Sequence, residues 1–149
     1  KEQELMTSEM FDMVEDLAYM VYELREHQKF AEKVMEDQPS GKKKAQAFYD
    51  ALESLRKELV ITSGDNYVAS AEPELRERMG ELYSNIASSY DRVSGAQKQN
   101  YVLISKEFEE AKMTYQKILD KEGKKFYSFA DKANMEKPTV QSKMEFLEK

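Results

Sequence analysis

The apolar stripe in residues 8–37 constrains the fold of this chain more than any other feature. Its residues recur at alternating steps of four and three, which places them along one side of a helix that packs lengthwise on other helices. At a rise of ~1.5 Å per residue this helix would be about 45 Å long, so shorter helices are expected to line up along it. The stripe consists of Met10, Val14, Leu17, Val21, Leu24, Gln28, Ala31 and Met35, of which only Gln28 is polar.

Three further stripes with the same period predict helices over about residues 41–61, 73–93 and 95–122. Together with the helix over 8–37, they predict an all-α fold, a four-helix up-and-down bundle. No strand-like alternation competes with this pattern. The stripes contain Ala45, Phe48, Leu52, Leu55 and Leu59, then Leu75, Met79, Leu82, Ile86 and Val93, and finally Gln97, Tyr101, Ile104, Phe108, Ala111, Tyr115 and Ile118.

Proline, glycine and serine mark where these helices begin and end. Pro39 breaks the first helix, and Pro73 fits the first turn of the third. Ser94 and Gln97 match a capping box at the start of the fourth helix. Gly80 lies inside the third helix, where a close helix crossing would explain it. Gly123 is expected to end the fourth helix in the left-handed conformation.

Residues 124–149 lose the helical period but remain rich in aromatic and aliphatic side chains. A segment of this kind is too apolar for a free tail. We therefore expect two parts: a bundle over residues 1–123 and an ordered C-terminal extension over 124–149 that packs on it. A short helix is expected after Pro138.

Composition argues against several classes of protein. The chain has 149 residues, a formal net charge of −6 and no cysteine, which argues against a nucleic-acid surface and rules out thiolate chemistry. No apolar run approaches the ~18 residues of a membrane span, so no membrane insertion is expected. The sequence begins at Lys1 rather than at methionine, which suggests that something was removed or that the chain is a piece of a longer polypeptide.

The residues offer little for catalysis or metal binding. A di-iron site in a helical bundle needs two Glu-x-x-His motifs, and the single histidine, His27, has leucine three positions before it. The sequence contains neither a P-loop nor a GxGxxG motif. Nine methionines are dispersed along the chain and fit core packing better than copper binding. We predict no catalytic residue, no cofactor and no metal, and a ferritin-like metal protein is the least favoured class.

Tyrosines are more numerous than the apolar stripes need. Because tyrosine is amphipathic and loses little entropy on binding, an excess of it favours a contact surface for a partner protein. A C-terminal extension that folds back would cover several of these side chains, so both interpretations stay open. The predicted partner-binding residues are Tyr19 and Tyr22, with Asp65, Asn66, Tyr67 and Val68 in the longest expected loop.

One part of the chain resembles a known family. Residues 59–62 read Leu-Val-Ile-Thr and residues 65–67 read Asp-Asn-Tyr; residues 73–79 read Pro-Glu-Leu-Arg-Glu-Arg-Met, and Leu82-Tyr83 and a last helix around Tyr101 and Phe108 follow. This block, residues 59–119, resembles the C-terminal helical domain of bacterial sortilin-like BNR-repeat β-propeller proteins, often labelled glycosyl hydrolases. The resemblance implies an accessory helical domain beside a propeller in an exported protein.

The predicted function is that of a non-catalytic accessory or interaction domain, the C-terminal part of a larger exported β-propeller protein. The alternative is a free-standing secreted helical binding protein, such as an effector or a cytokine-like bundle. In both cases the partner is a protein. The chain itself is expected to be a monomer or a weak dimer, the dimer forming through the aromatic residues after Gly123.

Overall fold

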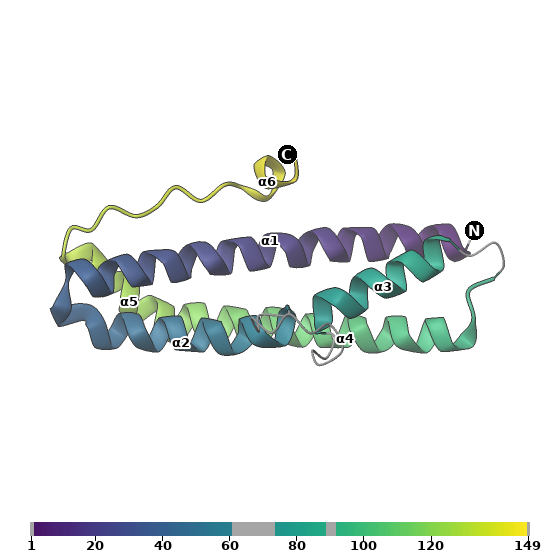
Figure 1. The fold of residues 1–149 in the computed structure, drawn as a ribbon, viewed down its shortest axis with the longest axis horizontal. Helices are drawn as coiled ribbons and strands as arrows, with labels where there is room; N and C mark the ends of the chain where they lie inside the picture. Colours follow the sequence, from purple (N-terminus) through teal and green to yellow (C-terminus); the bar gives the residue numbers. More distant parts are fainter. Residues whose placement is uncertain (1, 61–73, 89–91, 149) are drawn as a thin grey trace, which may run out of the picture. The chain divides into compact units, whose positions relative to one another are not determined.

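All regular secondary structure in the described residues, 2–60, 74–88 and 92–148 of the computed structural model, is helical, and these ranges contain no strand. The predicted all-α class is therefore confirmed. The helices are α1 (Glu2–Asp37), α2 (Lys42–Leu59), α3 (Leu75–Ala87), α4 (Gly95–Ile118), α5 (Lys124–Lys132) and α6 (Lys143–Leu147), with a 3₁₀ turn at Pro39–Gly41 and a π-helical segment at Leu119–Gly123 (Figure 1).

The chain divides into two compact units, and each is described by itself. The first unit comprises Lys1–Ala18 and Lys57–Ala111, and the second comprises Tyr19–Arg56 and Lys112–Lys149. The expected division at residue 123 is a different partition of the chain and stays a prediction.

In the first unit, polar contacts join α1, α3 and α4. The Gln3 side chain donates a hydrogen bond of 2.8 Å to the Ile86 carbonyl, which ties the start of α1 to α3. Arg78 of α3 donates two parallel hydrogen bonds, of 2.8 and 3.0 Å, to the Glu107 carboxylate of α4. The apolar core of this unit includes Met10, Leu17, Leu75, Met79, Leu82, Ile86, Ile104 and Phe108.

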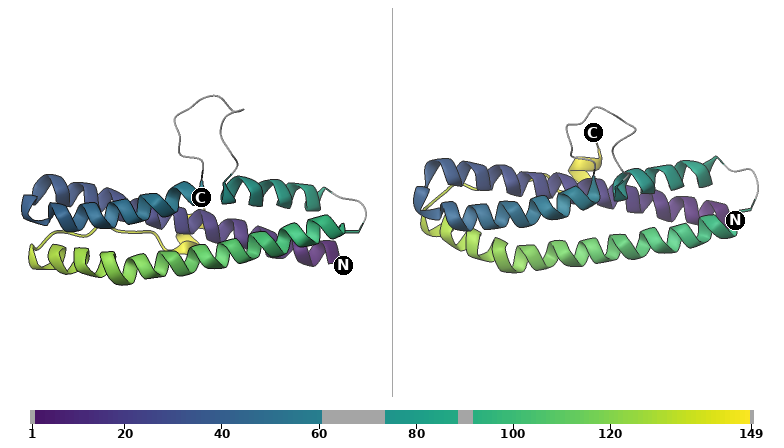
Figure 2. Two further views of the ribbon diagram at one scale, coloured as in Figure 1. Left: turned by 90° about the horizontal axis from the view of Figure 1, so that it is seen from below. Right: turned by 60° about the horizontal axis from the view of Figure 1, so that its bottom comes forward.

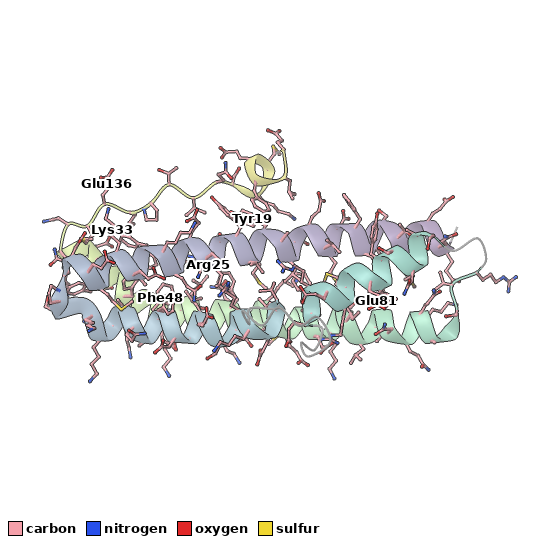
Figure 3. The ribbon with its side chains drawn as sticks, in the orientation of Figure 1. Tyr19, Arg25, Lys33, Phe48, Glu81 and Glu136 are labelled. Atoms are coloured by element: carbon pink, nitrogen blue, oxygen red, sulfur yellow. The ribbon has the colours of Figure 1, made fainter. Side chains whose placement is uncertain are left out.

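The second unit is built on a cluster of aromatic side chains, which we call the aromatic cluster: Phe30, Phe48, Phe126 and Tyr127. Phe126 is fully buried, and its ring centroid lies 5.2 Å from that of Phe48 and 5.5 Å from that of Phe30. Tyr127 stacks on Phe30 with a centroid distance of 5.7 Å. The cluster joins α1, α2 and α5, and Figure 3 labels its α2 member, Phe48.

Gln28, the polar residue of the first stripe, is fully buried in the second unit. Its amide nitrogen donates to the Glu53 carboxylate at 2.9 Å, and its carbonyl oxygen accepts from Arg25 at 2.7 Å. A buried amide costs free energy unless it is hydrogen-bonded, and here both ends of the amide have partners. Gln28 can therefore be buried among apolar residues, because neither its amide nitrogen nor its carbonyl oxygen lacks a hydrogen bond.

Gly123 does not end the fourth helix, which corrects the sequence-based expectation. Its φ is −63°, and the chain continues through the π-helical segment directly into α5, as the unbroken green ribbon in Figure 2 shows. A Cβ atom at Gly123 would lie 3.1 Å from Cε1 of Phe48, so the glycine admits the aromatic ring. Burial of Phe126 and Ala130 outweighs the local stop signal.

The helix that continues through α5 ends at Asn134 instead. Asn134 has a φ of 55°, the Asn134 N–H donates to the Asp131 carbonyl, and the Met135 N–H donates to the Ala130 carbonyl. This is a Schellman motif with asparagine in the left-handed position. The short helix expected after Pro138 is present as α6.

Two other helix boundaries differ from the expected ones. α1 begins at Glu2 rather than near residue 8, and the Lys98 ammonium lies 2.7 Å from the Glu2 carboxylate at that end. α3 ends at Ala87 rather than at residue 93. The capping box at Ser94 is confirmed, because the Gln97 N–H donates to the Ser94 hydroxyl at 3.0 Å and the Ser94 N–H donates to the Gln97 side chain at 2.9 Å.

Gly80 does not mark a close helix crossing, contrary to the expectation. A Cβ atom at this position would have no neighbour within 4 Å. At Gly41, by contrast, a Cβ atom would overlap the ring of Phe129, so the packing of this ring requires a glycine at this buried position.

These two glycines give a matched pair of substitutions. We expect Gly41→Ala to lower the free energy of unfolding by roughly 1–3 kcal/mol, because the Phe129 ring has to move. Gly80→Ala should raise it by up to about 1 kcal/mol, because alanine favours the helix and meets no atom. Urea unfolding followed by circular dichroism measures both. Equal effects of the two substitutions would contradict the packing at Gly41.

Candidate functional site

Tyr19 and Tyr22 lie on the same side of α1, three residues apart, and together form a surface that we call the tyrosine shelf. Their ring centroids are 5.9 Å apart, and both side chains are half-buried. The other predicted partner-binding residues, Asp65, Asn66, Tyr67 and Val68, lie outside the described residues. The shelf is therefore the part of the predicted site whose geometry is known.

The hydroxyl groups of the shelf bind the main chain of a single residue, Gln141. The Tyr19 hydroxyl donates to the Gln141 carbonyl at 2.9 Å, and the Gln141 N–H donates to the Tyr22 hydroxyl at 3.0 Å. Figure 3 shows Tyr19 between α1 and the C-terminal segment that carries α6. Since both bonds use backbone atoms of Gln141, they do not depend on its side chain.

Phe146 of α6 supplies the apolar part of the contact. Its ring stacks on Tyr22 with a centroid distance of 4.8 Å and an interplanar angle of 21°. The same ring meets Tyr19 nearly edge-on, at 5.8 Å and 60°. Aromatic pairs in such geometries contribute about 0.5–1.5 kcal/mol each beyond the area they bury. Phe146 is therefore the anchor of the C-terminal segment.

A capping box fixes the shape of α6. The Ser142 hydroxyl accepts from the Glu145 N–H at 3.2 Å, and the Glu145 carboxylate accepts from the Ser142 N–H at 3.3 Å. α6 has five residues, none of them buried, and Met144 is 74% exposed. A helix this short is not stable alone. Its conformation depends on the cap and on the contact with the shelf.

Glu23 directly follows Tyr22 on α1, and its carboxylate contacts the hydroxyl groups of Tyr19 and Tyr115. The Tyr115 hydroxyl donates to the Glu23 carboxylate at 2.7 Å, and the Tyr19 hydroxyl lies 3.5 Å from its other oxygen. Burial raises the pKa of Tyr19 and of Tyr115, and the negative charge of Glu23 raises both further. The Tyr19 hydroxyl is thus a stable neutral donor for the Gln141 carbonyl.

His27 pairs with Tyr127 of the aromatic cluster. The Nδ1 atom of His27 lies 2.6 Å from the Tyr127 hydroxyl, and its ring also meets Phe48 at a centroid distance of 5.6 Å. Burial lowers the pKa of His27, against the opposing effect of the Glu23 charge, and burial raises the pKa of Tyr127 to about 12. This environment favours a neutral imidazole that accepts the Tyr127 proton in a hydrogen bond.

A hollow of about 420 Å³ separates α1 from the extended segment that leads to α6. Lys137 anchors the near end of this segment, because its ammonium lies 2.9 Å from the Asp131 carboxylate and 5.5 Å from the centroid of the Tyr127 ring. The hollow is lined by Glu26, Lys29, Phe30, Lys33, Glu136, Lys137, Pro138 and Thr139. The segment is thus held at both ends and packs loosely between them.

Clustered metal-ligating side chains and long apolar helices are both absent from the described residues. Within residues 2–60, 74–88 and 92–148, no three or more histidine, aspartate or glutamate side chains converge as a metal site would require. None of the helices in these ranges combines the length and apolarity needed to cross a membrane. No protein-family model, curated protein or solved structure matches the chain.

Sequence reasoning selected the two tyrosines and left open that the C-terminal extension covers them, as residues 141–146 do, but it did not identify the residues that make the contact. Gln141 and Phe146 are separated from Tyr22 by 119 and 124 positions, and no local pattern connects them. The Ser-Lys-Met-Glu sequence at 142–145 matches a capping box and could have located α6. The bond between His27 and Tyr127 has no signal in a single sequence.

The half-buried imidazole of His27 predicts a pH dependence of stability. Above pH ~6.5, the ordinary pKa of histidine, His27 is neutral in both the folded and the unfolded chain, so it adds no pH dependence to the free energy of unfolding. Below it, the unfolded chain binds a proton that the folded chain resists, so the free energy of unfolding falls until the lowered folded pKa is reached. We expect the loss between pH 7.5 and 5.5, measured by urea unfolding, to be smaller in His27→Gln. The same loss in both proteins would contradict a half-buried neutral His27.

Proposed function

We propose that this chain is a non-catalytic helical module that binds a protein partner, and that the tyrosine shelf is its binding surface. We also propose that the helices form a four-helix up-and-down bundle with the C-terminal segment as an ordered extension. The long α1 supports this arrangement, since its stripe offers one continuous apolar side. The shelf is the feature that links the fold to binding.

The observation that carries the proposal is the way the shelf holds residues 141–146. The two tyrosine hydroxyls form hydrogen bonds with the carbonyl and the N–H of Gln141, and both tyrosine rings pack against the ring of Phe146. Main-chain hydrogen bonds with an aromatic anchor are the usual elements of peptide recognition. Raised pKa values keep the hydroxyls of Tyr19 and Tyr115 neutral, which suits hydrogen bonding better than acid–base catalysis near neutral pH.

The resemblance of residues 59–119 supports a context for this module. We propose that it is the C-terminal accessory domain of a larger exported β-propeller protein. The alternative, a free-standing secreted binding protein, makes a different prediction about size. An antibody against the chain should detect a native species several times heavier than 17.4 kDa in the source cells. A native species near that mass would favour the free-standing protein.

Binding by the shelf can be measured in the full-length chain. Phe146→Ala removes the internal anchor, and a labelled peptide with the sequence of residues 140–148 is then titrated by fluorescence anisotropy. We expect saturable binding with a Kd of roughly 0.1 mM, as suits one aromatic anchor and two hydrogen bonds. Adding Tyr22→Ala should weaken it at least about tenfold, since stacking and a hydrogen bond are both lost.

Leu103→Ala in the Phe146→Ala chain is the matched control, because Leu103 is 53% exposed on α4 and lies in the first unit. It should leave the Kd unchanged. Binding that survives Tyr22→Ala, or no binding at all by the Phe146→Ala chain, would refute the shelf as a binding surface.

A further inference from the structure

Resting on the function proposed above, we infer that residues 141–147 are a built-in competitor for the shelf. The partner is then a protein segment that presents the same features: an N-capped helical turn with an aromatic residue in its second turn. The C-terminal segment occupies the shelf in the absence of the partner and leaves when the partner binds.

The contacts define what such a segment must contain. Ser142 is the N-cap of α6, so Gln141 stands just before the cap and Phe146 stands four residues after it. The shelf forms hydrogen bonds with the backbone of Gln141 and packs against the side chain of Phe146. The capping box between Ser142 and Glu145 sets the turn that brings these two positions to the same two tyrosines.

The side chain of Met144, between the cap and Phe146, is less constrained, because it is 74% exposed. The residue before the cap can be any amino acid with a backbone N–H, because the Tyr22 hydroxyl accepts from that group. Proline has none and is excluded there. The expected partner motif is therefore any residue but proline, then Ser or Thr, two variable residues, Glu or Gln, and an aromatic residue.

Three observations indicate that the C-terminal segment can leave the shelf. No residue of α6 is buried, and Glu136, Lys137, Pro138 and Thr139 of the preceding segment are exposed. The hollow of about 420 Å³ between this segment and α1 means that little packing is lost when it lifts. The Schellman motif at Asn134 already ends α5 with its own hydrogen bonds, so α5 keeps its C-terminal cap when the residues beyond Met135 move.

Tethering sets the strength of the competition. Five residues, 136–140, connect the Schellman motif to Gln141, and a connector of this length gives an effective concentration on the order of 1 mM. A free peptide with an intrinsic Kd of about 0.1 mM then binds roughly tenfold more weakly to the closed chain, because the tail occupies the shelf most of the time.

The first experiment compares full-length chains that differ only in the tail. The labelled peptide of residues 140–148 is titrated into the wild-type, Phe146→Ala and Met144→Ala proteins. The Phe146→Ala chain should bind at least about fivefold more tightly than the wild type, and Met144→Ala should behave as the wild type. Binding to the Phe146→Ala chain that is no tighter than to the wild type would show that the tail does not compete, while leaving the shelf as a binding surface intact.

The second experiment tests the motif with peptide variants on the Phe146→Ala chain. The peptide with Gln141→Ala should bind with a Kd within about twofold of that of the unchanged peptide. The peptides with Gln141→Pro and with Phe146→Ala should bind at least about tenfold more weakly. Ser142→Ala should weaken it severalfold through loss of the cap. Equal affinities of the Ala and Pro variants at position 141 would overturn backbone recognition and with it the proposed partner class.

The oligomeric state of the wild-type chain completes the test. Light scattering should report a monomer of about 17.4 kDa at concentrations below the effective concentration of the tail. A dimer that dissociates in Phe146→Ala would overturn the inference, because the tail would then serve the shelf of a second copy rather than act as an internal competitor.

Discussion

Packing of Phe126 and Tyr127 against Phe30 and Phe48 is the interaction on which the second unit depends. It joins α5 to α1 and α2, although the chain contains a glycine and a π-helical segment just before α5. Gly41 and Gly123 supply the space for the rings of Phe129 and Phe48. The position of α5 then decides where the C-terminal segment starts and which part of α1 it can reach.

The tyrosine shelf uses the same helix for a different purpose. Tyr19 and Tyr22 stand on α1 beside Glu23, and they bind a segment that returns from the far end of the sequence. We therefore expect local opening of the exposed, loosely packed segment to cost much less free energy than opening of the core. The proposed exchange of this segment for a partner peptide would leave α1 in place and change only what covers Tyr19 and Tyr22.

Much of the fold could be predicted from the sequence because the apolar period is a local signal. Leu24, Leu52, Met79 and Ile104 were expected on the stripes, and all are buried. Gly123 misled the prediction, since burial of residues beyond it outweighs the propensity of one glycine. Tyr19 and Tyr22 could be selected by their excess over the core, but their contacts with Gln141 and Phe146 depend on tertiary structure. The contacts of His27 with Tyr127 and Phe48 also depend on tertiary structure and cannot be read from the sequence.

The most direct test is a nuclear magnetic resonance measurement on the full-length wild-type chain. If the C-terminal segment occupies the shelf, nuclear Overhauser effects connect the ring protons of Phe146 with those of Tyr22, and the Gln141 amide proton exchanges more slowly than its exposed neighbours. Random-coil chemical shifts throughout residues 135–148, with no contact between Phe146 and either tyrosine, would contradict the account.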